Sequence, residues 1–117
     1  MPKPKPLARV DVFDVAAGKW STGPELPGGR VGFSPAACAV GGRAVVSTSE
    51  GSVYRLSAAG DAWEKAATSE TRRIVHRLIP AGNDVLLVGG AFGGGGGNAG
   101  NAERVRIGAK EGKPKSE

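Results

Sequence analysis

Residues 10–20 of this chain read VDVFDVAAGKW, and residues 53–63 read VYRLSAAGDAW. The two stretches align without a gap, so that Trp20 falls on Trp63, 43 residues further along. A repeat of about this length is typical of stacked structural units or of a propeller, in which each unit buries its apolar face against the next. The repeat therefore predicts the architecture more directly than it predicts a function.

The composition favours short strands joined by turns. The chain has 117 residues, enough for one small domain, and contains 20 Gly and 8 Pro. Its glycine content exceeds the usual value of about 7%. Short apolar runs alternate with turn signals such as Gly41-Gly42 and Gly89-Gly90, which punctuate antiparallel strands. We therefore expect an all-β fold.

The order of these signals predicts about nine short strands in three groups. Two strands are expected within residues 9–27, four within 30–66 and three within 73–108. The third group includes a Gly-rich loop at 93–101. Residues 74–79 read as a strand, although periodicity alone also allows a short helix there.

Flanking tails carry most of the excess charge. Pro and Lys alternate over residues 2–6, and residues 109–117 are mostly polar and basic. Both tails, 1–8 and 109–117, are predicted to be disordered. The net charge of +5 sits mainly in these tails, without the basic stripe that nucleic-acid binding requires. No apolar run suits a membrane span or a signal peptide. We expect a cytoplasmic protein, unless the chain is a piece of a longer secreted one.

The order of the motifs resembles the kelch repeat over roughly residues 9–108. That pattern comprises an Arg after a Pro-rich turn, a Gly-Gly pair, an aromatic residue followed by Asp, and a later Trp. The matching residues are Phe13, Asp14, Trp20, Arg30, Trp63, Arg73, Gly89 and Gly90. The chain departs from the pattern at Ser47-Thr48, where Gly-Gly is expected, and the third copy has no Trp.

The resemblance implies antiparallel four-stranded blades of a β-propeller, with the Trp and the aromatic residue packed between blades. Propellers typically close with 4–8 blades, and nine strands make little more than two. The expected fold is a kelch-type propeller fragment: the end of one blade, a full blade and an incomplete one. Its open edges would pair with further blades, with a protein partner or with another copy.

Chemistry-bearing residues are few. Cys38 and His76 are the only Cys and the only His, so a disulfide within the chain is impossible and a structural zinc site lacks ligands. A Cys–His nucleophile pair would also need an orienting group and an oxyanion hole, for which the sequence has no local signature. The Gly-rich run 89–97 lacks the Lys-Ser/Thr and the helix of a phosphate loop. We predict no enzymatic activity, no metal and no cofactor.

Four repeat-equivalent side chains remain as candidates for recognition. Arg30 and Arg73, which lie 43 residues apart, are predicted anchors for an acidic partner, unless each bonds the carbonyls of its own turn. Trp20 and Trp63 could stack on a sugar or a base, but their equivalence favours packing between blades. Asp14, close to Asp11, is interpreted as a turn-maker.

The predicted function is a non-enzymatic protein–protein interaction module, or a fragment of a larger kelch propeller. One alternative is a carbohydrate-binding protein or part of a secreted galactose-oxidase-like propeller. A copper site of that kind needs several His and Tyr residues, and Tyr54 is the only tyrosine. The other alternative is a truncated coding segment without independent function.

Overall fold

The computed structural model describes residues 8–27, 35–92 and 97–107, and every helix or strand element in these ranges is a strand. The strands are β1 (Asp11–Asp14), β2 (Lys19–Thr22), β3 (Ala36–Val40), β4 (Arg43–Ser47), β5 (Ser52–Leu56), β6 (Trp63–Thr68), β7 (Arg73–Ile74), β8 (Arg77–Ala81), β9 (Asp84–Val88), β10 (Ala91–Phe92) and β11 (Ala102–Arg106). The predicted all-β class is confirmed, and the helix considered at 74–79 is replaced by strand β8.

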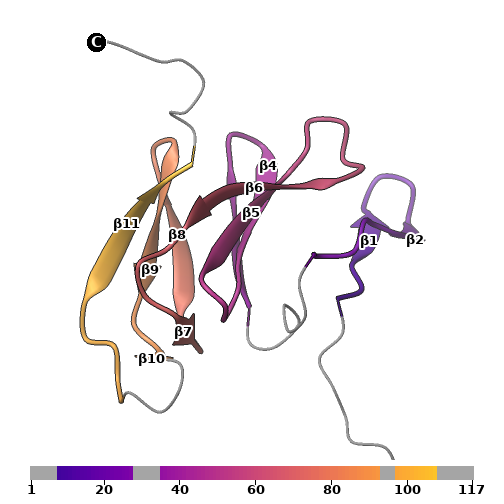
Figure 1. Cartoon of the computed structure of the whole chain (residues 1–117). Coiled ribbons are helices and arrows are strands. Elements are labelled where there is room, and N and C mark those ends of the chain that lie inside the picture. The colour runs from indigo at the N-terminus through magenta and orange to yellow at the C-terminus, as the bar shows by residue number, and fades with distance from the viewer. Residues whose placement is uncertain (1–7, 28–34, 93–96, 108–117) are drawn as a thin grey trace, which may run out of the picture.

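All strand pairs are antiparallel. β1 and β2 form a hairpin, β3-β4-β5-β6 form a four-stranded sheet, and β8, β9 and β11 form a three-stranded sheet in the order β11-β9-β8. These groups correspond to the predicted two, four and three strands. The sequence did not indicate the short pairing of β7 with β10, which holds the connections at one end of the three-stranded sheet (Figure 1).

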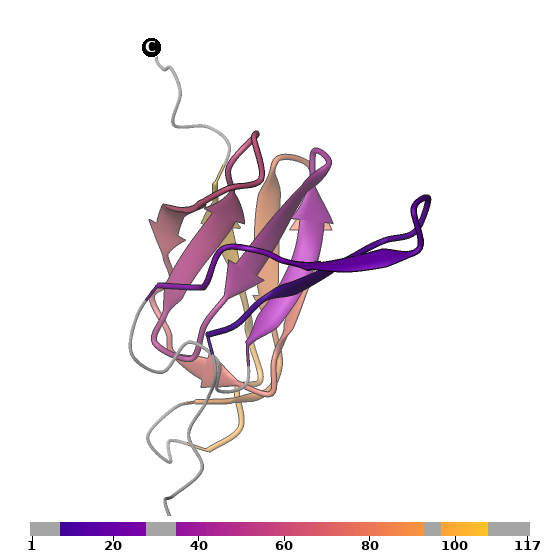
Figure 2. The same ribbon diagram turned by 90° about the vertical axis from the view of Figure 1, so that its right-hand side faces the viewer.

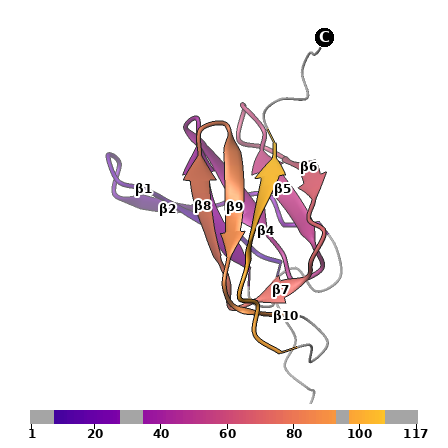
Figure 3. The same cartoon turned by 90° about the vertical axis from the view of Figure 1, so that its left-hand side faces the viewer.

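The main core lies between the four-stranded and three-stranded sheets, which face each other with β3 beside β8 (Figure 3). Alternate residues of the strands point into this layer, as expected for sheets with one buried face. The buried side chains are Ala36, Val45, Val53, Leu78, Val85, Leu87, Val105 and Ile107.

A second, smaller cluster covers the other face of the four-stranded sheet. Val46 and Tyr54 of the sheet pack with Leu26, and Trp63 and Val10 lie against them. Backbone bonds from Leu26 to the Ala8 carbonyl (3.0 Å) and from Gly23 to the Val10 carbonyl (2.8 Å) extend the pairing at the base of the β1–β2 hairpin. The hairpin itself projects away from both sheets (Figure 2).

The sequence repeat is also a repeat of strand register. Phe13 pairs with Trp20 across β1–β2, and Leu56 pairs with Trp63 across β5–β6. Each residue of the second pair therefore lies the same number of positions after its counterpart in the first pair. Asp14 Oδ1 accepts the N–H of Ala17 at 3.2 Å, as the turn-maker interpretation predicted. The two hairpins therefore share the same strand register at the spacing of the sequence repeat.

Some predicted segments lie outside the described residues. These are Arg30 and almost all of both tails, although Ala8 belongs to the hairpin base. Of the Gly-rich loop 93–101, residues 97–101 are described. Ala99 in this part is buried, and its N–H donates to the Gly90 carbonyl at 2.9 Å.

Candidate functional site

Arg73, one of the two predicted partner anchors, is a buried residue of β7 with only 1% of its surface exposed. Its guanidinium donates to the carbonyls of Gly89 (3.2 Å) and Asn101 (2.9 Å) and to the Asn101 side-chain oxygen (3.1 Å). Its Nε donates to Thr71 Oγ1 at 3.1 Å. The alternative to a partner anchor was that Arg73 bonds the carbonyls of its own turn; its buried guanidinium instead bonds carbonyls 16 and 28 residues further along the chain, and it is not displayed to a partner.

The Gly89-Gly90 pair ends β9 beside Arg73. Both residues have positive φ, 70° for Gly89 and 79° for Gly90. A Cβ on Gly90 would overlap the carbonyl oxygen of Ile74, whereas a Cβ on Gly89 would meet nothing within 4 Å. Gly90 therefore permits a close backbone approach, and Gly89 permits only the turn.

His76 makes a contact that the sequence reasoning missed. Its Nε2 lies 3.0 Å from the Oγ of Ser47, and both residues are buried. Burial, together with the nearby Arg73 guanidinium, lowers the pKa of His76 below its ordinary 6.5. Ser47 occupies a position where the repeat motif has Gly, and this departure from the motif was the one sequence feature that pointed to a special role for Ser47.

The Ser47–His76 pair is not arranged for nucleophilic catalysis. No partner within the described residues orients His76 Nδ1, which is buried. Ser47 has no exposed surface on which a substrate could be attacked. Cys38 pairs with Val45 on the neighbouring strand, and burial raises the pKa of its thiol. The Ser47–His76 pair is therefore a buried polar contact between the four-stranded sheet and the β7–β8 connection.

Residues 8–27, 35–92 and 97–107 contain no group of three or more His, Cys, Asp or Glu side chains placed to hold a metal ion. Nor do these ranges include a helix long and apolar enough to cross a membrane. A cavity of about 410 Å³ between β3 and β8 is lined mostly by small and apolar residues, with His76 and Arg77 as its polar members.

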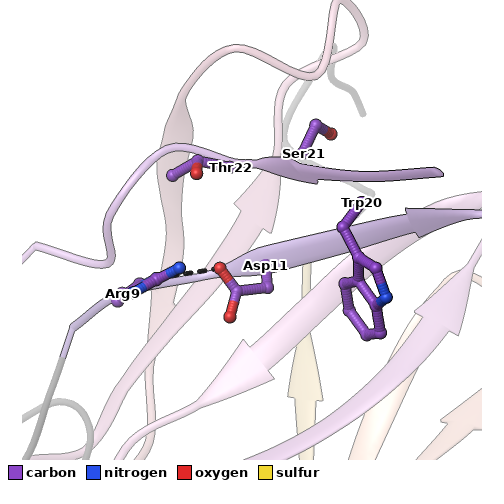
Figure 4. Close-up of a pocket in the computed structure, with 5 residues that line it drawn as sticks. All are labelled: Arg9, Asp11, Trp20, Ser21 and Thr22. Atoms are coloured by element: carbon purple, nitrogen blue, oxygen red, sulfur yellow. Dashed lines mark hydrogen bonds and ion pairs between the residues drawn. The ribbon is translucent and has the colours of Figure 1, made fainter.

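The β1–β2 hairpin presents the most exposed aromatic surface in the described chain. Trp20 is 71% exposed and Phe13 is 45% exposed, and their ring centroids are 5.0 Å apart. Beside Trp20 lies a shallow pocket of about 470 Å³ formed by Arg9, Asp11, Ser21 and Thr22, with Arg9 Nε 2.9 Å from Asp11 Oδ1 (Figure 4).

The equivalent face of the β5–β6 hairpin is covered. Trp63 donates its indole N–H to the Pro24 carbonyl at 2.8 Å. Leu26 packs in the same cluster. Within the described residues, no segment covers Trp20 in this way.

Comparison of the chain with protein-family models and with curated proteins finds no match.

Proposed function

We propose that this chain is part of a kelch-type β-propeller and acts as a non-enzymatic protein–protein interaction module. In this proposal β3–β6 form one blade, and β8, β9 and β11 form the first three strands of the next. The β1–β2 hairpin then supplies the outer two strands of the preceding blade. The constant register of the two hairpins and the adjacency of the first strands, β3 and β8, support this assignment.

The observation that carries the proposal is the difference between two equivalent tryptophans. The face around Trp63 is covered by the chain segment before it, including Pro24 and Leu26. The same face around Trp20 is exposed, together with Phe13. Large exposed aromatic side chains in a repeat position are natural contacts for a protein partner or for a further blade.

The sheet edges support the same conclusion. Among the described strands, β11 pairs only with β9, so its other edge can accept a fourth strand. A two-stranded hairpin such as β1–β2 is marginally stable on its own and gains from added strands. In the proposed assembly, strands from a partner or from another copy of the chain occupy these edges.

The test compares association by the wild type, Trp20→Ser and a matched control, Val15→Ser. Val15 is an exposed apolar residue at the turn of the same hairpin. Each protein is used as bait in cell lysate, and its own association is followed by light scattering over a concentration series. We expect the wild type and Val15→Ser to bind the same partner or to self-associate. Trp20→Ser should lose both the partner and the self-association. Equal behaviour of all three proteins would contradict the proposal.

A second candidate function is carbohydrate binding at the same hairpin. Trp20 offers a flat ring, and the pocket beside it contains the ion-paired side chains of Arg9 and Asp11, whereas the Ser21 side chain points to the other side of β2 (Figure 4). Sugars are commonly held by such a combination of a stacking ring and polar groups. A glycan array probed with the wild type and with Trp20→Ser separates this function from protein binding. If the hairpin binds carbohydrate, the wild type gives a signal on the array without any protein partner, and Trp20→Ser does not.

A further inference from the structure

The surroundings of Trp63 show how a tryptophan at this repeat position is covered. The Pro24 carbonyl accepts the Trp63 indole N–H at 2.8 Å. Leu26, two residues later, is buried in the cluster against which Trp63 packs. Proline has no N–H to pair and a fixed φ, so its carbonyl is held in place at little conformational cost. The cover is therefore a proline-containing segment that offers one carbonyl and one side chain.

Trp20 presents the same chemical groups without a cover. Its side chain is 71% exposed, and no described residue accepts a hydrogen bond from its indole N–H. Phe13, its cross-strand neighbour, is 45% exposed and extends the aromatic surface. A buried tryptophan usually has its N–H paired as well as its ring packed, and tryptophan is a frequent anchor in protein interfaces. A segment that supplies a carbonyl satisfies both parts of the Trp20 side chain.

The faces around the two tryptophans differ at one position of the repeat. Tyr54 is buried and packs with Leu26. The repeat places Asp11 at the equivalent position, and its side chain points to the same side of the hairpin as Trp20 (Figure 4). The Asp11 carboxylate is half-exposed and pairs with Arg9 through one oxygen. An apolar side chain packed there would desolvate the ion pair without replacing its hydrogen bonds to water.

We propose that the Trp20 face binds a proline-containing peptide segment of a partner protein, with an amide side chain two residues after the proline. The proline carbonyl accepts the Trp20 indole N–H. The amide of Asn or Gln donates to the Asp11 carboxylate and accepts from the Arg9 guanidinium, so it matches both members of the ion pair. This inference rests on the proposed protein-binding function and adds the chemistry of the segment that is recognised.

The experiment titrates the ¹⁵N-labelled full chain with two synthetic peptides that have blocked ends. One has the sequence of residues 22–27, Thr-Gly-Pro-Glu-Leu-Pro, and the other has Asn in place of its Leu, which has nearly the same shape. The Trp20 indole resonance is identified by its absence in Trp20→Phe. We expect the Asn peptide to shift this resonance saturably, whereas the Trp63 resonance stays in place because its N–H is already bonded to Pro24.

The comparison of the two peptides tests the role of Asp11. The Leu peptide should bind the wild type roughly tenfold more weakly than the Asn peptide, because it lacks the hydrogen bonds to the charged pair. Asp11→Tyr reproduces the side chain that Tyr54 has at the equivalent position, so this variant should prefer the Leu peptide. Val15→Ser, at the turn of the same hairpin, is the matched control and should bind both peptides as the wild type does. Circular dichroism establishes that each variant is folded.

The inference is overturned if the Asn peptide produces no saturable shift of the Trp20 resonance, or if the Trp63 resonance moves as much. Equal binding of the two peptides to the wild type, or an unchanged preference in Asp11→Tyr, also overturns it. Its failure is distinguishable from failure of the proposed function. Trp20-dependent capture of a protein without peptide binding refutes only the inference, whereas binding of the Asn peptide without any captured protein or self-association refutes only the proposed function.

Discussion

Replacing Gly90 or Gly89 with Ala tests the close approach at the end of β9. Both positions have φ near the left-handed region, which costs an L-residue about 1–2 kcal/mol. Only at Gly90 does the new Cβ also overlap the Ile74 carbonyl and lie 2.9 Å from His76 Cα. Forcing a methyl group into a packed position typically costs about 1–3 kcal/mol more. We therefore expect Gly89→Ala to lose about 1–2 kcal/mol of unfolding free energy and Gly90→Ala about 2–5 kcal/mol.

The assay is equilibrium unfolding in urea, followed by circular dichroism and extrapolated linearly to water. Amide hydrogen exchange adds a local measurement, because the Ala99 N–H donates to the Gly90 carbonyl and should exchange faster in Gly90→Ala. Gly89→Ala should leave that amide close to its wild-type rate. Equal stability losses in the two variants, with unchanged exchange at Ala99, would refute the argument that Gly90 is required by backbone contact.

Two further predictions concern the polar groups next to this turn. Arg73→Lys should lose about 2–4 kcal/mol of unfolding free energy, because lysine keeps the charge but leaves the buried carbonyls of Gly89 and Asn101 unpaired. The control Arg72→Lys, at the exposed neighbouring position, should change the unfolding free energy by less than about 0.5 kcal/mol. Similar urea midpoints for the two variants would contradict this. Because the pKa of His76 is lowered in the folded state, the unfolded chain takes up this proton at a higher pH than the folded chain does. The contribution of His76 to the unfolding free energy should therefore be fully present above pH 6.5 and decrease as the pH falls below it. His76→Gln should lack this part of the pH dependence, and identical pH profiles for the two proteins would rule out His76 as its source.

Much of the fold was predictable because its signals are local. Gly41-Gly42 has positive φ at both residues, as tight hairpin turns require, and alternating apolar residues mark which face of each strand is buried. The spacing between Trp20 and Trp63 also predicted that two hairpins would be equivalent. The β7–β10 pair was not predictable, since each strand has only two residues and the pairing joins Arg73 to Phe92 across a long connection.

The polar sites were harder to predict because they depend on contacts between strands that are distant in sequence. The sequence left Arg73 as either an anchor for a partner or a residue that bonds carbonyls of its own turn, and only the packing of the β7 and β10 connections shows that its guanidinium bonds the Gly89 and Asn101 carbonyls. Ser47 ends β4 of the four-stranded sheet, whereas His76 lies in the connection between β7 and β8. The meeting of Arg43, Arg55 and Glu64 requires the register of three neighbouring strands. Residue types alone do not specify such geometry.

The two tryptophans show most clearly where sequence reasoning ends. Repetition in the sequence makes Trp20 and Trp63 equal, and their cross-strand neighbours confirm that equality. Their surroundings differ, because Pro24 and Leu26 lie against Trp63, whereas no described residue covers Trp20 in the same way. A local pattern can specify the side chains on a face without specifying what covers it. In the proposed assembly, a protein partner or a further blade covers the face of Trp20, and that contact gives the exposed ring its function.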